Sequence, residues 1–520
     1  GNVFNFIING KRVFARGANW VPADAFPSRV TAERYRKLLE MARRSNMNML
    51  RVWGGGIYES DVFYDLCDRL GIMVWQEFMF ACAPYPQNER FLRGVEEEAR
   101  AVVRRLRNHP SIVIWCGDNE VDWSYTWWGR SDWAQNRINR AVLKNVVEEL
   151  DPTRPYMPSS PFSPDPAADP NSPDQGDRHN WDVWHGKQPY RAYARDRARF
   201  CSEFGMQASP AAETMREVIP PEQWSWPPGD SWAHHNLDLQ KLSPYMEEFG
   251  GAQCVEDFIR LSQLTQATVL KFAIEHFRRS KFACGGCMFW QFNEPWPTVC
   301  WSVVDYFGRP KMGYYYVKRA YSNVLVSLKE EGEGRLSLWI VNDGLEGVEG
   351  DLIVERRDFA GRRIWSDRRR VRVPPNSVLK AADVRIPEMP LASMRTEYFS
   401  ARLAKGSQVI SENSHFLVRE RDLVLPEARL TVRARVDRSD GGDVLYKVEV
   451  GSDSYARVVK VDLGVDAQYS DNYFDVPANE SREILVRVRR GVPVSRVTVK
   501  AHNSAESSCD LAPMGPLRPG

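Results

Sequence analysis

The chain has 520 residues and a formal net charge of +2, so it exceeds one ordinary core and carries no charge excess typical of a nucleic-acid or anionic-membrane binder. Apolar residues make up 43%, as in globular proteins, and no apolar run reaches the roughly 18 residues of a membrane-spanning helix. The first residues lack the apolar core of a signal peptide, which favours a cytoplasmic over a secreted location.

Residues 1–325 alternate short apolar runs with helical patterns. Amphipathic stretches such as 31–45 and 94–109 separate several of the runs, and Thr31 suits the N-cap of the first stretch. Eight strands, many followed by helices, are typical of a (β/α)8 TIM barrel. The eight runs are 13–20, 47–55, 72–78, 112–117, 155–160, 181–185, 199–205 and 287–294.

The segment 160–180 is rich in Pro and Asp. It follows the fifth apolar run, so we expect a long βα loop of the kind that shapes a pocket.

From residue 326 the pattern changes to alternation with period two, interrupted by turns. This pattern predicts antiparallel strands, and the remaining length suits two β-sandwiches of immunoglobulin-like size. We therefore predict an α/β barrel over 1–325 followed by all-β sandwiches over 326–422 and 423–520.

The cysteines do not indicate a disulfide framework. There are nine, of which eight lie before residue 301 and only Cys509 follows. The CGGC stretch from Cys284 to Cys287 has no second pair, so we interpret it as small buried residues on a strand. Since no metal-binding motif such as H-E-x-x-H occurs, the sequence predicts neither a metal nor another cofactor. The first residue is Gly rather than Met, which indicates a processed or truncated product.

Tryptophan is concentrated in the predicted barrel, where 16 of the 18 residues lie. Flat rings with free N–H groups suit the apolar faces and hydroxyls of sugars. The alternative is that about half of these rings only pack loops against the barrel. Those at expected strand ends are Trp20, Trp53, Trp184 and Trp290, and those close behind Glu120 are Trp123, Trp127 and Trp128.

Two glutamates follow strands of the predicted barrel. Glu120 ends the fourth run and Glu203 lies in the seventh, so both belong to the C-terminal ends of strands, where barrel active sites form. These strands lie on opposite sides of a barrel mouth, and two carboxylates across one sugar are what glycoside hydrolysis requires. A single strand-end glutamate is more often a salt-bridge partner, but the pair favours catalysis.

The chain resembles the β-mannosidases of glycoside hydrolase family 2 over nearly the whole barrel. The matching stretches are FARGANWVPAD, NMLRVWGGGIYESDVFYDLCDRLGIMVWQEFMFACAPYP, RRLRNHPSIVIWCGDNE, WDVWHG, RFCSEFGMQ and MFWQFNEPWP with SVVDYFGRPK, and YSDNYFDVPANE resembles their last sandwich. The resemblance implies that Glu120 is the general acid/base and Glu203 the nucleophile of a retaining double displacement. Their carboxyl groups are then expected to lie about 5–5.5 Å apart.

Further site residues are implied by the resemblance. Asn119 corresponds to an Asn that bonds the sugar 2-hydroxyl, with a strand-end turn as the alternative. Trp290 corresponds to the floor under the sugar, and Trp53 and Trp128 to further walls of the pocket.

Charge and packing suggest the remaining candidates. Arg51 ends the second run and suits the task of keeping Glu203 ionised, although it equally suits a pair with Glu77. Glu77 stands where many relatives have Asp, and we expect it to contact substrate hydroxyls. Trp184 and His185 are weaker candidates, because local packing explains them almost as well. His109 precedes Pro110 after a helix, and we expect it to be structural.

The sequence leaves alternatives open. Relatives carry two β domains before the barrel, so it stays open whether a second polypeptide completes the pocket. In addition, Asp118 stands where relatives frequently have Asn. The favoured substrate is a β-mannoside or manno-oligosaccharide, with no nucleic acid or membrane as partner. The rivals are another family 2 specificity (β-galactosidase, β-glucuronidase or exo-β-glucosaminidase) and a glycan-binding protein without activity. The sequence predicts no oligomeric state.

Overall fold

The computed structural model describes residues 4–511 and divides into two compact units. Within the described residues, the first unit contains residues 4–325, 340–348 and 373–379, and the second contains residues 326–339, 349–372 and 380–511. The predicted domain boundaries at 325 and 422 stay predictions. The first predicted domain begins with residues 1–3 and the last ends with residues 512–520, and both segments lie outside the described residues.

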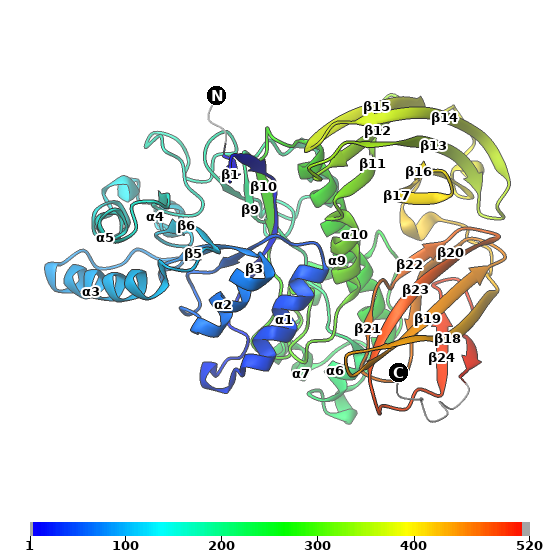
Figure 1. Ribbon diagram of the computed structural model, residues 1–520, viewed down its shortest axis with the longest axis horizontal. Coiled ribbons are helices and arrows are strands. Elements are labelled where there is room, and N and C mark those ends of the chain that lie inside the picture. The colour runs from blue at the N-terminus through cyan, green and yellow to red at the C-terminus, as the bar shows by residue number, and fades with distance from the viewer. Residues whose placement is uncertain (1–3, 512–520) are drawn as a thin grey trace. The chain divides into compact units, whose positions relative to one another are not determined.

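The first unit is built on a curled sheet of eight parallel strands, which confirms the predicted barrel (Figure 1). The hydrogen-bonded order is β7-β6-β5-β4-β3-β10-β9-β8, so each barrel strand pairs with the next one along the chain, except that β7 and β8 are not paired and the first strand, β3, pairs with the last, β10. The strands are β3 (Ala15–Trp20), β4 (Met49–Val52), β5 (Met73–Glu77), β6 (Ile112–Cys116), β7 (Tyr156–Met157), β8 (Arg178–His179), β9 (Cys201–Glu203) and β10 (Gly286–Phe289).

The sixth strand is not the one predicted from the apolar run 181–185. That run forms turns, because the backbone N–H groups of His185 and Gly186 both donate to the carbonyl of Trp181 at 2.9 Å. The strand is β8, just before it, whose pairing with β9 aligns Arg178 with Cys201. This polar segment serves as a barrel strand because its buried side chain, His179, finds hydrogen-bond partners in Glu120 and Ser160.

Helices follow most of the strands. Thr31 caps α1 (Ala32–Arg44) by accepting a bond from the backbone N–H of Arg34 at 3.2 Å, as predicted. Helix α3 (Glu89–Leu106) begins before the predicted residue 94, because Asn88 accepts from the N–H of Phe91. The others are α2 (Asp61–Leu70), α4 (Val121–Trp127), α5 (Leu143–Leu150), α6 (Ala212–Arg216), α7 (Asp230–His234), α8 (Leu239–Met246), α9 (Val255–Arg279) and α10 (Met312–Ala320).

The N-terminal end of the barrel is filled by apolar side chains. A hairpin of β1 (Phe6–Ile8) and β2 (Lys11–Val13) precedes the first barrel strand. Phe6 packs edge-on against Phe200 of the barrel at 6.0 Å between ring centroids, in one core with Trp75 and Met288. This packing leaves only the C-terminal ends of the strands free to form a pocket.

The remaining strands form antiparallel sheets, as the period-two pattern predicts (Figure 1). Two sheets have the orders β11-β12-β15 and β14-β13-β16-β17, and two have the orders β18-β19-β23-β21 and β22-β20-β24-β25. The first pair comprises β11 (Val324–Glu330), β12 (Arg335–Asn342), β13 (Val348–Asp358), β14 (Arg363–Val373), β15 (Ser377–Arg385), β16 (Glu397–Lys405) and β17 (Gln408–Phe416), with a short α11 (Leu391–Met394). The second pair comprises β18 (Leu430–Asp440), β19 (Asp443–Ser452), β20 (Ala456–Asp462), β21 (Gln468–Tyr469), β22 (Phe474–Val476), β23 (Glu480–Arg489), β24 (Arg496–Lys500) and β25 (Ser507–Asp510).

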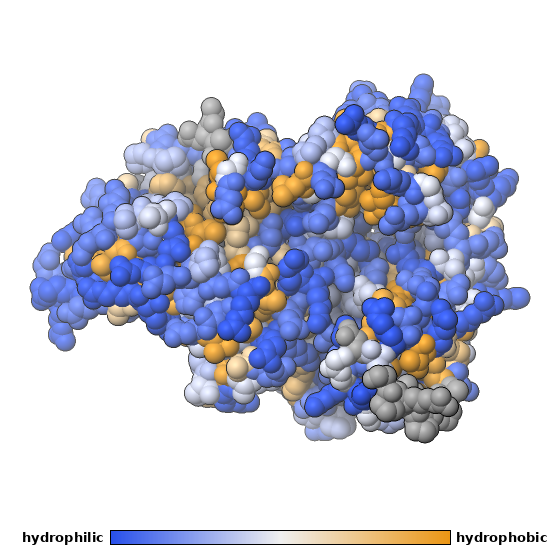
Figure 2. Space-filling model, viewed as in Figure 1, coloured by the Kyte–Doolittle hydropathy of each residue, from blue (hydrophilic) through white to orange (hydrophobic). Residues whose placement is uncertain are grey.

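The surface drawn in Figure 2 is largely hydrophilic, with smaller hydrophobic areas between the polar ones. Within residues 4–511, no helix has both the length and the apolar character that crossing a bilayer requires.

Candidate active site

The backbone beyond β6 turns sharply and directs Glu120 into the barrel mouth. Glu120 adopts left-handed dihedral angles (φ 59°, ψ 14°) where α4 begins, a conformation that non-glycine residues rarely adopt. Its N–H donates to the carbonyl of Ser160 at 2.7 Å, and the N–H of Asn119 donates to Phe80 at 2.9 Å. Backbone bonds to the neighbouring loops therefore hold this turn, and strain of this kind is commonly found at functional sites.

Glu203 is the last residue of β9, and its backbone is equally constrained. The carbonyl of Glu203 accepts from the backbone N–H of Asn180 at 2.7 Å. The carbonyl of Phe204 accepts from the backbone N–H of Trp290 at 2.8 Å. A Cβ at Gly205 would lie 2.2 Å from the carbonyl oxygen of Trp290. Glycine lets the two backbones approach this closely.

The two glutamates lie together with a histidine that the sequence analysis missed. Oxygen atoms of Glu120 and Glu203 and a ring nitrogen of His179 all lie within 4.8 Å of one another. Nδ1 of His179 is 2.7 Å from Oε1 of Glu120 and 3.4 Å from Oε2 of Glu203. The carboxyl groups of retaining glycosidases lie roughly 5–5.5 Å apart and those of inverting enzymes roughly 6.5–9.5 Å, so oxygens within 4.8 Å of each other favour the shorter spacing.

A cavity of about 510 Å³ opens over the two carboxyl groups. This volume suits a ligand the size of a small sugar. Its lining consists of Trp53, Cys82, Asn119, Glu120, Trp123, Trp127, Trp181, His185, Glu203, Trp290 and Trp301.

The structure brings six of the ten sequence-predicted site residues to the cavity wall. Arg51 and Glu77 lie directly beneath it and are fully buried. Trp128 is 68% exposed and Trp184 is 1% exposed, and neither lines the cavity. Trp184 instead stacks on Tyr245 at 5.9 Å, which is the packing alternative that the sequence left open. The six at the wall are Trp53, Asn119, Glu120, His185, Glu203 and Trp290.

Arg51 is the central cation of the site. Its guanidinium donates to Oε1 of Glu203 at 2.6 Å and to Oε1 of Glu77 at 2.8 Å. It also donates to the amide oxygens of Asn119 at 2.7 Å and Asn19. Both predicted partners of Arg51 are therefore present, and one buried cation binds two acids and orients Asn119.

The surroundings make the two catalytic candidates chemically different. Burial, followed by the charge of Glu203, raises the pKa of Glu120 well above its ordinary value. Burial also raises the pKa of Glu203, but the Arg51 charge, the Arg51 hydrogen bond and the indole N–H of Trp181 at 3.0 Å oppose it. The proton of the pair therefore belongs on Glu120 and the charge on Glu203.

Glu77 contacts protein groups rather than the cavity. Its second oxygen accepts from the N–H of Gly54 at 2.8 Å, and burial raises its pKa to about 7. We therefore expect Glu77 to act through Arg51 and not through substrate hydroxyls.

Aromatic rings form the walls of the cavity. Trp53 and Trp290 meet edge to face at 5.1 Å between centroids, and Trp181 contacts both His185 at 5.1 Å and Trp301 at 6.2 Å. Burial and the nearby Lys241 lower the pKa of His185 to about 4, so its ring is neutral. Neutral rings around two carboxyl groups suit a sugar better than a charged ligand.

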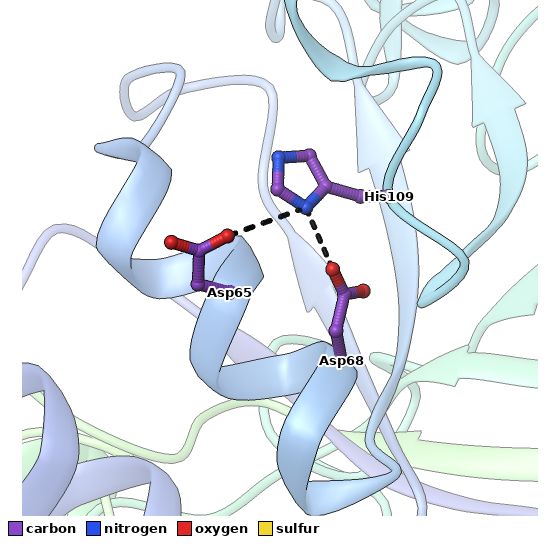
Figure 3. A group of neighbouring side chains, drawn as sticks. All are labelled: Asp65, Asp68 and His109. Carbon is purple, nitrogen blue, oxygen red and sulfur yellow. Dashed lines mark hydrogen bonds and ion pairs between the residues drawn. The ribbon is translucent and has the colours of Figure 1, made fainter.

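Among residues 4–511, two groups of side chains have the donor atoms for a cation. In the first, Glu120, His179 and Glu203, the guanidinium of Arg51 already supplies the positive charge beside Glu203. The second is Asp65, Asp68 and His109, shown in Figure 3, where Nδ1 of His109 lies 2.7 Å from Asp68 and 4.0 Å from Asp65. Asp68 also accepts from the N–H of Ser111 at 2.9 Å. This second group fastens the loop before β6 to α2, at the end of the barrel away from the cavity.

Comparisons with known families give matches to three family models. The model described as glycosyl hydrolases family 2, TIM barrel domain, matches residues 3–160. A mannosidase Ig/CBM-like domain matches residues 334–422, and an Ig-fold domain of mannosidases matches residues 425–505. Together they cover the first five barrel strands and the antiparallel strands from β12 to β24.

Individual relatives agree with these models. A β-D-mannosidase from Dictyoglomus thermophilum has a similar structure, with a TM-score of 0.90 and 38% identity over 97% of this chain and 62% of its own. Beta-mannosidase B of Neosartorya fischeri is 36% identical over 68% of this chain and 45% of its own length. An exo-chitosanase from Amycolatopsis orientalis, at 16% identity and a TM-score of 0.76, shares the fold. The chain thus spans less than two thirds of the length of these relatives.

Proposed function

Because the chain belongs to glycoside hydrolase family 2, we propose that it acts as a retaining exo-β-mannosidase that removes terminal β-D-mannosyl residues by double displacement. The observation that carries the proposal is the approach of the two carboxyl groups to within 4.8 Å at one cavity. The 36–38% identity to β-mannosidases supports mannose as the sugar.

In the first step Glu203 attacks the anomeric carbon while Glu120 gives its proton to the departing oxygen. Arg51, at 2.6 Å, and Trp181, at 3.0 Å, keep the attacking carboxylate ionised and oriented. The bond to the leaving group breaks as the ester to Glu203 forms, which gives a covalent mannosyl intermediate.

In the second step Glu120 acts as the base. Conversion of Glu203 into an ester removes its negative charge, and that charge is the second cause of the raised pKa of Glu120. The pKa of Glu120 therefore falls, and the ionised carboxylate takes a proton from the water that attacks the ester.

The remaining cavity residues bind the sugar in this proposal. Asn119, oriented by Arg51, bonds the 2-hydroxyl, and Trp290 and Trp53 pack against the ring. The relatives are longer than this chain, so we also propose that further β domains, in the same or a second polypeptide, complete the rim.

A panel of aryl β-glycosides tests the sugar specificity. We expect the β-mannoside to be hydrolysed with a kcat/KM at least about 100-fold above the β-glucoside, β-galactoside, β-glucuronide and β-glucosaminide, because a site that pairs a specific hydroxyl rejects epimers strongly. Initial rates of aryl alcohol release measure this. Preference for another glycoside would assign a different family 2 specificity, and binding of mannosides without release would assign a glycan-binding role.

A further inference from the structure

A chain of buried polar groups behind Glu120 has no place in the two steps above. It consists of His179, Ser160 and Asp177, each 0% exposed, and is here called the Asp177–Ser160–His179 relay. The three residues come from the loop after β7 and from β8, at the seam where β7 and β8 are not adjacent in the sheet. Buried polar groups that are neither solvated nor catalytic need a reason, because burying them costs free energy.

Each contact in the relay is short. Nδ1 of His179 lies 2.7 Å from Oε1 of Glu120, and Nε2 lies 3.0 Å from Oγ of Ser160. The hydroxyl of Ser160 is 2.6 Å from Oδ2 of Asp177. The relay therefore runs without a gap from a buried aspartate to the proposed acid/base.

The hydrogen-bond partners of Asp177 determine in which direction the groups of the relay donate their hydrogen bonds. Asp177 faces three donors, namely the hydroxyls of Ser160 at 2.6 Å and Ser202 at 2.5 Å and the N–H of Phe162 at 3.0 Å. Three donors around one carboxyl group are the surroundings of an ionised acceptor. Burial raises the pKa of Asp177 from its ordinary value, whereas these donors and Arg51 oppose that rise.

The tautomer of His179 follows from the single proton of Ser160. The Ser160 hydroxyl has one hydrogen to donate, and it donates that hydrogen bond to Asp177. Toward His179 the hydroxyl oxygen can then only accept a hydrogen bond, which must come from Nε2–H. A neutral imidazole with its proton on Nε2 has a lone pair on Nδ1. That lone pair faces Glu120, so the hydrogen bond of 2.7 Å requires the proton to be on Glu120.

The charges around His179 are consistent with a neutral ring. Burial and then the charge of Arg51 lower its pKa well below 6.5. The acids that face it are Glu120 at 2.7 Å and Glu203 at 3.4 Å, and the guanidinium of Arg51 is bound to the second of them.

We propose that His179 is a positioning residue, fixed by Ser160 and Asp177 as a hydrogen-bond acceptor, which keeps the catalytic proton on Glu120 until the departing oxygen takes it. This inference rests on the proposed function for the role of Glu120. When Glu120 is ionised, its oxygen and the Nδ1 lone pair face each other without a proton between them. The relay thus favours the protonated acid, in addition to the effects of burial, Glu203 and Glu77 and against those of Arg51 and Cys82.

Neutron diffraction from deuterated crystals of the parent protein tests the relay without any substrate. We expect deuterium on Nε2 of His179 and none on Nδ1, with the deuteron of Ser160 directed at Asp177. Deuterium on Nδ1 of His179 would overturn the inference. Since the measurement involves no turnover, this result does not depend on whether the protein hydrolyses mannosides.

The pH dependence of Ser160→Ala gives a second test. Without the hydroxyl, His179 is free to place its proton on Nδ1 and donate to the Glu120 carboxylate, which favours the ionised form. We expect the basic limb of the pH profile of kcat/KM to move to lower pH by about one unit. The profile is measured on whichever unactivated disaccharide the parent hydrolyses. Ser159→Ala is the matched control, because Ser159 is also 0% exposed but bonds Asp118 rather than His179.

The two variants together separate positioning from packing. We expect Ser159→Ala to keep the basic limb of the parent. An unchanged limb in Ser160→Ala, or an equal shift in both variants, would contradict the relay. A parent protein with no activity on any glycoside would refute the proposed function, and the neutron result would still decide where the proton lies.

Discussion

Replacement of Glu203 by Gln is expected to reduce kcat on every glycoside by roughly 10⁵-fold, the scale of removing a covalent nucleophile. The amide is nearly isosteric and keeps an oxygen for Arg51, but it cannot form the ester. The loss should be the same for activated and unactivated leaving groups, because both need the attack on the anomeric carbon. Steady-state assays with both substrate types measure it, and an unchanged unfolding temperature shows that the fold is retained.

Azide identifies the face of the sugar that Glu203 attacks. In Glu203→Ala, azide can enter the space of the lost carboxylate and attack directly, so we expect α-mannosyl azide as the product. A β-mannosyl azide from this variant would mean that Glu203 is not the nucleophile.

Replacement of Glu120 by Ala is expected to have an effect that depends on the leaving group. On an unactivated disaccharide, kcat/KM should fall by about 10³-fold, because the departing sugar needs a proton. On a dinitrophenyl mannoside, whose leaving group needs none, kcat/KM should stay within about tenfold of the parent. The kcat of Glu120→Ala on this activated substrate should still fall, since hydrolysis of the covalent intermediate then lacks a base.

Three further measurements check the assignment of Glu120. The parent should lose kcat/KM as pH rises through the raised pKa of Glu120, and this limb should be absent in the variant. Azide should restore kcat on the activated substrate and give β-mannosyl azide, because it attacks the covalent intermediate from the opposite face. Normal hydrolysis of disaccharides by Glu120→Ala would show that the acid is another residue.

The order of the strands could be predicted because strands buried on both faces are continuous apolar runs bounded by turn residues. The runs that contain Met49, Trp75 and Ile114 are of this kind, and all three side chains lie in the barrel core. Once the runs were counted, the rule that barrel sites lie at strand ends indicated Glu120 and Glu203 without any coordinates.

The sixth strand could not be predicted in this way. It has two residues, of which His179 is a buried polar side chain, so it offers no apolar run. The apolar run beside it, 181–185, predicts a strand in the wrong place, so the sequence pattern does not single out His179. A signal was present, because Asp177 and His179 lie within the segment 160–180, which the sequence predicts to be a loop that shapes the pocket.

The direction of single side chains also lay beyond the sequence. Trp127 and Trp128 are neighbours at the end of α4, yet only Trp127 lines the cavity. Successive helix positions point about 100° apart, and the sequence does not say which one faces the site. Similarly, Trp181 rather than Trp184 reaches Glu203.

The stereochemistry of the product tests the central claim, that one sugar lies between two carboxyl groups less than 5 Å apart, more directly than any variant. Proton NMR during the first minutes of hydrolysis separates the two anomers of the released sugar before they interconvert. We expect the β-anomer to appear first, as double displacement on Glu203 requires. Initial release of the α-anomer would contradict the assignment of Glu203 as a covalent nucleophile.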